Sequence, residues 1–149
     1  MMIDVRWFWL IHSAARHISE HAELPGDLWL LAHELQLILV EGTGPKGRSV
    51  GMVIFARPDG PDPDPDPDNL AFLIQSALDE LQDLVVTTNR SDWPQESGRL
   101  MAAASIEDNI LRCGYVTQGD DIQTPGSPSV VFPPVALDTT PPAPARIAG

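Results

Sequence analysis

The clearest pattern of apolar and polar positions covers residues 69–88. Apolar side chains recur there at the three- and four-residue spacing of one helix face, namely Leu70, Leu73, Ile74, Ala77, Leu78, Leu81, Leu84 and Val85. Polar and acidic residues fill the opposite side. The pattern predicts an amphipathic helix that needs an apolar surface to lie on, with Asp68 or Asn69 as its N-terminal cap.

Residues 3–22 have the same period and predict an N-terminal helix. Trp7, Phe8 and Trp9 widen its apolar stripe, so that aromatic rings cover more than one face. Aromatic side chains contribute much of the binding energy of protein interfaces. This helix is therefore either wedged into the core or a contact patch for another subunit, and the three aromatic residues are candidate partner-binding residues.

Residues 27–41 are compatible with two structures. Asp27 can cap a helix with an apolar side made of Leu28, Leu31, Ala32, Leu35 and Leu39. The apolar run at 37–40 would serve equally well as a strand, because short apolar runs fit both elements. We expect a helix that ends near Gln36 or continues to Val40, followed by a Gly/Pro-containing loop at 42–48.

Short β-rich segments predict strands at 49–57, 99–106, 110–117 and 129–133. Glu107-Asp108-Asn109 lies between the second and third of these, which indicates a β-hairpin. The predicted fold class is α+β: an antiparallel sheet of about four strands carries the long amphipathic helix on one face. The aromatic N-terminal helix packs beside it or bridges to a neighbour.

Two segments are rich in proline. At 58–68 proline alternates with aspartate, which favours an extended, hydrated loop over helix, strand or a calcium site. At 138–149 proline and alanine dominate, and the composition cannot build a core. We therefore expect one domain at 1–137, with an extended C-terminal arm.

Composition limits the classes of function. The chain has 149 residues and a formal net charge of −12, which argues against binding to nucleic acid. Its one cysteine, Cys113, cannot form an intramolecular disulfide, which suggests a reducing compartment. No run approaches the roughly 20 apolar residues of a membrane span. We expect a cytoplasmic protein of the host cell that contacts no membrane.

Three stretches have partial motifs for chemistry. His17-Ile18-Ser19-Glu20-His21 matches the zinc pattern H-x-x-E-H, but no later helix offers an obvious third ligand, and exposed histidines on a polar helix face explain it better. His33-Glu34 begins H-E-x-x-H, yet Leu37 replaces the second histidine. Residues 42–49 nearly match the phosphate-binding pattern G-x-x-x-x-G-K-[ST]. However, Arg48 replaces the lysine, and a strand is predicted to follow where the pattern needs a helix.

Two further features have a simple structural explanation. Cys113 shares a strand face with Leu111 and Tyr115, where a lone cysteine usually packs in a core. Asp79, Glu80 and Asp83 lie on the predicted exposed side of the long helix. No pocket is implied beside these carboxylates, so they are a solvated face or a patch for arginines of a partner.

The second half of the chain resembles small uncharacterised proteins of actinobacteria and their phages. The resemblance lies in the segments Asp79-Glu80-Leu81-Gln82-Asp83-Leu84, Asp92-Trp93-Pro94, Gly114-Tyr115 and Phe132-Pro133-Pro134-Val135. It covers about residues 70–137. It implies an accessory protein and transfers no catalytic residue.

The expected function follows from these features. We expect a non-enzymatic structural or assembly protein without cofactor or metal, such as a phage head–tail connector or tail terminator, found in the host cell and in the virion. Its partners would be further copies or neighbouring virion subunits. One alternative is an acidic inhibitor that binds a basic host partner. The other is a small zinc hydrolase using His17, Glu20 and His21.

Overall fold

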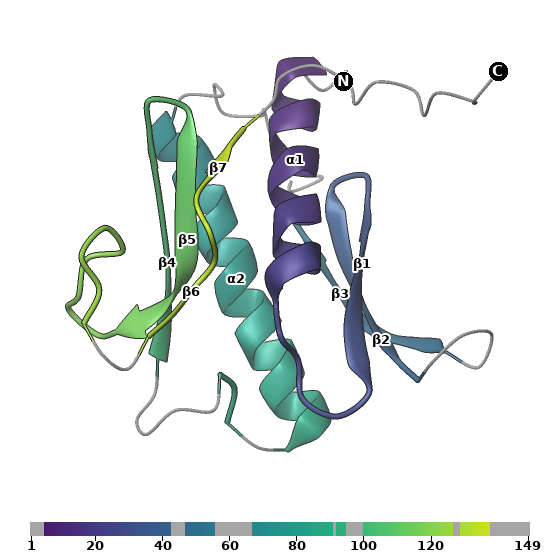
Figure 1. Ribbon diagram of the computed structural model, residues 1–149. Coiled ribbons are helices and arrows are strands. Elements are labelled where there is room, and N and C mark those ends of the chain that lie inside the picture. The colour runs from purple at the N-terminus through teal and green to yellow at the C-terminus, as the bar shows by residue number, and fades with distance from the viewer. Residues whose placement is uncertain are drawn as a thin grey trace, which may run out of the picture.

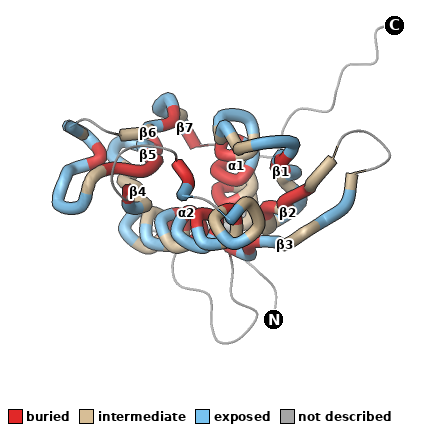
Figure 2. The backbone as a smooth tube through the Cα atoms, turned by 90° about the horizontal axis from the view of Figure 1, so that it is seen from below, coloured by how far each residue is buried: buried red, intermediate tan, exposed pale blue. Residues whose placement is uncertain are grey.

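The computed structural model describes residues 5–42, 47–55, 67–90, 92–94, 100–126 and 129–137, with side chains from Phe8 onward. These residues form an α+β fold in which a helix followed by antiparallel strands occurs twice along the chain. The first helix precedes a three-stranded sheet, and the second precedes a four-stranded one. Both helices lie between the two sheets (Figures 1 and 2).

The N-terminal helix α1 spans Val5–His21, as the period of its apolar residues predicts. Its buried side is made of Leu10, Ile11, Ala14, Ala15 and Ile18. The two alanines have the smallest of these side chains, so the backbone can approach its neighbours closely. α1 packs chiefly on the first strand of the three-stranded sheet.

The prediction of a helix at 27–41 is wrong, because this segment forms a β-hairpin. Strand β1 spans Leu28–His33 and strand β2 spans Gln36–Glu41. The turn between them is short, and Glu34 has the positive φ of 53° that such turns require. Buried residues alternate with more exposed ones over most of both strands, which is the period of a sheet.

Strand β3, Arg48–Ile54, is where a strand is predicted, but it belongs to a different sheet from the one expected. It pairs antiparallel with β2, so the first sheet has the order β1-β2-β3. The predicted single sheet that joins 49–57 to 99–106 is therefore wrong. Once residues 27–41 form a hairpin, β2 offers β3 a sequence-adjacent edge, and consecutive strands usually pair.

The long helix α2 spans Pro67–Asn89 and confirms the amphipathic pattern. Its buried residues are Leu70, Ile74, Ala77, Leu78, Leu81, Gln82 and Val85. The helix packs mainly on the second sheet and also on β3 of the first. At β3 the approach is close: a Cβ on Gly51 would lie 2.5 Å from a terminal methyl of Leu84. α2 therefore joins the two sheets.

The second sheet contains β4 (Leu100–Glu107), β5 (Ile110–Thr117), β6 (Ser129–Val131) and β7 (Val135–Ala136). The predicted hairpin is confirmed. Asp108 and Asn109 form its two-residue turn with φ values of 51° and 63°, the left-handed pair that matches the twist of the strands.

The last predicted strand, 129–133, is confirmed only in part. β6 ends at Val131, and the separate strand β7 pairs with β5 further along. The break falls at Pro133 and Pro134, which have no N–H to donate to a neighbouring strand. Most of segment 58–68 and all of the arm 138–149 lie outside the described residues.

Tyr115 lies at the centre of the core and is fully buried on β5. Its hydroxyl donates to the Leu78 carbonyl of α2 at 2.7 Å, and its ring meets Trp93 edge-on at 5.1 Å between centroids. The Trp93 indole N–H donates to the Glu23 carbonyl at 2.8 Å. These contacts connect β5 to α2 and to the segment after α1, so Trp93 anchors its segment in the core.

Gly114 of β5 allows the close approach of β6. A Cβ there would contact the Val130 carbonyl oxygen and lie 2.7 Å from the Val131 Cα. Because backbone cannot move aside as a side chain can, we expect Gly114→Ala to lower the free energy of unfolding by about 1–3 kcal/mol, measured by urea denaturation. At Gly126 a Cβ would meet only the end of the Asp120 side chain. An equal loss in Gly126→Ala would contradict this explanation.

Candidate functional site

The outer face of the β1-β2-β3 sheet points away from both helices. Strand pairing and alternation place nine side chains on it, in three rows that cross the strands. The rows are Trp29–Val40–Ser49, Leu31–Ile38–Met52 and His33–Gln36–Ile54. We call these nine residues the outer face. Six of them are apolar, although the opposite face of the same strands forms part of the core.

Four large apolar side chains of the outer face are exposed to solvent. The exposed fractions are 40% for Trp29, 46% for Leu31, 56% for Met52 and 45% for Ile54. Seven large apolar residues are exposed in the described part of the chain, so more than half of them gather on this one surface. Trp29 and Leu31 lie on β1, and Met52 and Ile54 lie on β3. Ile38 of β2 lies between them, and neighbouring strands are only about 4.8 Å apart, so the rows form one patch.

The Trp29 side chain is held in place on this surface. Its indole N–H donates to the carbonyl of Gly42, just beyond β2, at 2.7 Å. Gly42 continues β2, the strand that pairs with β1, and Val40, the direct partner of Trp29 on β2, is buried. A fixed aromatic ring gives up less conformational entropy when a partner covers it.

The outer face carries no carboxylate at any of its nine positions, although the chain has 21 aspartates and glutamates. His33 is its only titratable residue. Glu41 and Arg48 lie at the strand ends and pair with each other at 3.4 Å. The surface is therefore close to neutral on a strongly acidic protein.

The outer side of the second sheet differs, because the chain covers part of it. Gln123, in the loop after β5, donates to the Ser105 hydroxyl of β4 at 3.4 Å. Ile122 of this loop and Val116 of β5 are both buried. Figure 1 shows the loop on the side of the β4–β5 hairpin away from α2. Among the described residues, no such loop covers the first sheet.

The predicted aromatic patch of α1 is only half-exposed. The rings of Phe8 and Trp9 pack edge-on at 4.9 Å between centroids, and His12 stacks on Phe8 at 6.1 Å. His12 also lies 3.2 Å from the Glu34 carbonyl through Nδ1. His12 therefore joins this aromatic group of α1 to the β1–β2 turn. The side chain of Trp7 lies outside the described part.

The predicted acidic patch is exposed on α2. Asp79, Glu80 and Asp83 all face solvent. Asp79 lines a shallow surface hollow with Met101 of β4, and Asp83 lines the cavity described next. These carboxylates lie on a different element from the outer face, so the sequence-predicted partner residues do not form one site.

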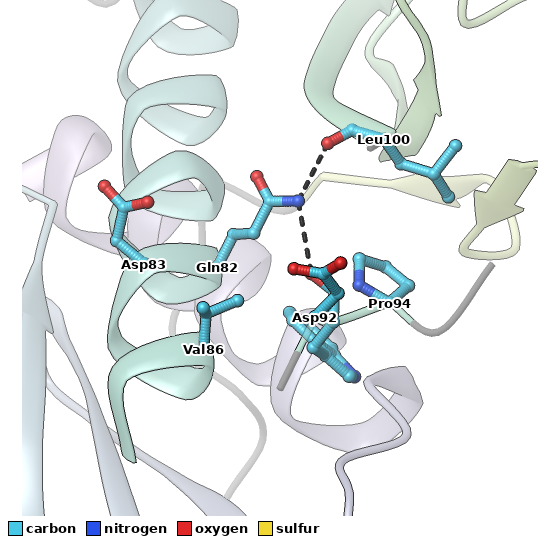
Figure 3. Close-up of a pocket in the computed structure, with 7 residues that line it drawn as sticks. Gln82, Asp83, Val86, Asp92, Pro94 and Leu100 are labelled. Carbon is cyan, nitrogen blue, oxygen red and sulfur yellow. Dashed lines mark hydrogen bonds between the residues drawn. The ribbon is translucent and has the colours of Figure 1, made fainter. Parts of the chain in front are cut away.

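A small cavity lies between α2, the segment 92–94 and β4, with a volume of about 120 Å³. Figure 3 shows the Gln82 amide pointing from α2 toward β4, across this space. Its Nε2 donates to the carbonyls of Trp93 at 3.2 Å and Leu100 at 2.8 Å. Ligand pockets usually exceed about 300 Å³, so the arrangement serves to fasten the chain rather than to hold a substrate.

Replacing Gln82 by methionine tests this fastening role. Met keeps the length of the side chain but leaves two buried carbonyls without a donor, which costs about 1–3 kcal/mol each. We expect a clearly lower free energy of unfolding for Gln82→Met in urea denaturation. Gln75→Met is the matched control, because Gln75 is exposed and accepts one bond from the Ala104 N–H at 3.3 Å. Equal losses in both variants would contradict this role.

The sequence suggested that both histidines of the H-x-x-E-H stretch are exposed, but only one of them is. His17 is buried, and its Nε2 donates to the Pro133 carbonyl at 2.6 Å, whereas His21 is exposed. Glu20 instead pairs with Arg16 at 3.7 Å. No group of three or more His, Cys, Asp or Glu among the described residues could hold a metal ion.

Cys113 lies on the buried face that its spacing predicts. Burial raises the pKa of its thiol to about 12, so the sulfur stays protonated and unreactive near neutral pH. The Tyr115 phenol is also kept protonated, because burial raises its pKa well above the ordinary value. Both residues therefore act in packing.

His17 should make stability depend on pH. Burial lowers the pKa of its imidazole, the Pro133 bond opposes this, and nearby His21 lowers the pKa further. As the pH falls, the His17 imidazole of the unfolded chain therefore takes up a proton at about pH 6.5. In the folded chain the same imidazole stays neutral to a lower pH. The stability due to neutral His17 is full above about pH 6.5 and is lost as the pH falls through the folded value.

Urea denaturation between pH 8 and pH 5 measures this effect. We expect the wild type to lose more stability over this range than His17→Gln, which has no imidazole to charge. His21→Gln is the control, since that ring is exposed. A pH profile of His17→Gln parallel to that of the wild type would show that another group is responsible.

Comparisons with protein-family models, with curated proteins and with solved structures find no match for this chain. Neither helix in the described part is long and apolar enough to cross a membrane. The class of protein is therefore defined by its own geometry: an α+β fold of two sheets around two helices, with one apolar, uncharged sheet face exposed.

Proposed function

We propose that this protein is non-enzymatic and acts by binding another protein through the outer face. The observation that supports this most is the gathering of Trp29, Leu31, Met52 and Ile54 on a surface without carboxylates. Single exposed apolar residues are ordinary, but contiguous apolar patches mark interaction surfaces. The centre of a protein interface is also poor in charge and rich in aromatic residues and methionine.

A narrower form of this proposal places the protein in a phage particle, as a head–tail connector or tail terminator among neighbouring virion subunits. Two features support it. The chain is a small acidic domain with an apolar sheet face, and residues 70–137 resemble small proteins of actinobacteria and their phages. An α+β subunit of this kind contributes to an assembly through surface contacts, with no reaction centre.

A second candidate function is the acidic inhibitor. Asp79, Glu80 and Asp83 are exposed on consecutive turns of α2, where they could meet arginines of a basic partner. This surface would be sensitive to salt. Binding through the outer face would persist in salt, because it relies on apolar contact.

Photo-crosslinking tests which surface binds. A benzophenone amino acid is placed at position 52 of the full chain, in a lysate of the organism that encodes it. Position 101 is the matched control: Met101 is also a methionine on an outward strand position, with 47% exposed. We expect a discrete protein adduct at 52 that survives high salt and is weak or missing at 101. Equal labelling at both positions would count against the outer face.

A further inference from the structure

We infer that the partner on the outer face is a second copy of this chain, packed sheet on sheet about a two-fold axis. This inference rests on the proposed function, and it adds the identity and orientation of the partner. Two features of the outer face support it, its charge and its shape, and its area limits how stable the dimer can be.

The charge of the outer face permits a second copy. Each chain carries a net charge of −12, so two copies repel each other over most of their surfaces. The outer face is free of carboxylates, and Arg48 at its edge is already paired with Glu41. Two copies can therefore meet here with little local repulsion. A basic partner finds no carboxylate to pair with on this surface, because the exposed carboxylates of α2 lie elsewhere.

The shape suits an interface that is the same on both sides. A two-fold interface must be complementary to itself, and an apolar grid meets this condition because apolar side chains pack against apolar side chains. Two sheets pack face to face about 10 Å apart with their strands about 30° from parallel. Ile38 is the middle residue of the grid, on the middle strand. It therefore lies opposite Ile38 of the second copy.

The area indicates a weak dimer. Three strands of about six residues give a footprint of roughly 14 by 20 Å, which is small against the ~800 Å² per partner of a standard interface. We therefore expect a dimer that dissociates on dilution.

Sedimentation velocity of the full chain over a concentration series tests the dimer. We expect the wild type to shift from monomer toward dimer as concentration rises. Met52→Glu should weaken the dimer by about tenfold or more, because it buries an unpaired charge. Met101→Glu has the same net charge and should dimerise like the wild type. A wild type that stays monomeric at all concentrations, or two variants that behave alike, would overturn the inference.

Charge exchange at Ile38 tests the symmetry. Ile38→Glu and Ile38→Lys should each be monomeric alone, because like charges would meet at the axis. Mixing them in equal amounts should restore a dimer, because glutamate then faces lysine. Circular dichroism of each variant shows whether it is folded. Two folded variants that stay monomeric when mixed would overturn the two-fold arrangement.

The results separate this inference from the proposed function. If the purified chain is monomeric and position 52 crosslinks to a different protein, the second copy is rejected. The outer face then remains a binding surface for that other protein. A dimer that is unaffected by Met52→Glu, with no preference of crosslinking for position 52, rejects both. Adducts of twice the chain mass at position 52, lost on dilution, support both.

Discussion

The burial of α2 is the constraint on which the rest of the structure depends. Its apolar face packs mainly on β4 and also on β3, so one helix closes the core of both sheets. Directed bonds then fix its position: Leu78 accepts from the Tyr115 hydroxyl, and Gln82 donates to Trp93 and Leu100. Burial supplies the driving force, because it removes a full helix face from water, and the polar contacts select one docking geometry.

This arrangement determines which surfaces remain free. Both helices lie between the sheets, so each sheet has only its inner face covered by a helix (Figure 2). The second sheet covers part of its outer side with the loop that contains Ile122 and Gln123. The segment between β2 and β3 does not give the first sheet a similar cover within the described residues. In the described part of the chain, the outer face therefore stays open to water.

The sequence predicted both helices, the hairpin at Asp108-Asn109 and the buried side of α2, because each has one apolar face and one polar face. It placed the strand at 49–57 in the same sheet as 99–106, because a helix predicted at 27–41 leaves β3 without its true neighbour β2. The buried His17 was also missed, because its acceptor, the Pro133 carbonyl, is distant in sequence. Phe8 and Trp9, predicted as partner-binding residues, are exposed only in part. The predicted acidic residues are exposed on α2, which is a different surface from the outer face.

One property explains both the wrong prediction at 27–41 and the candidate site. Leu28 and Leu30 face the core, while Trp29 and Leu31, which alternate with them, face outward. Strands with apolar residues on both sides lose the alternation that identifies a strand, and such runs are typical of sheets buried on both faces. Here the described residues cover only one face of the sheet. The apolar residues on the uncovered side of such a strand are the feature on which the proposed binding of another protein rests.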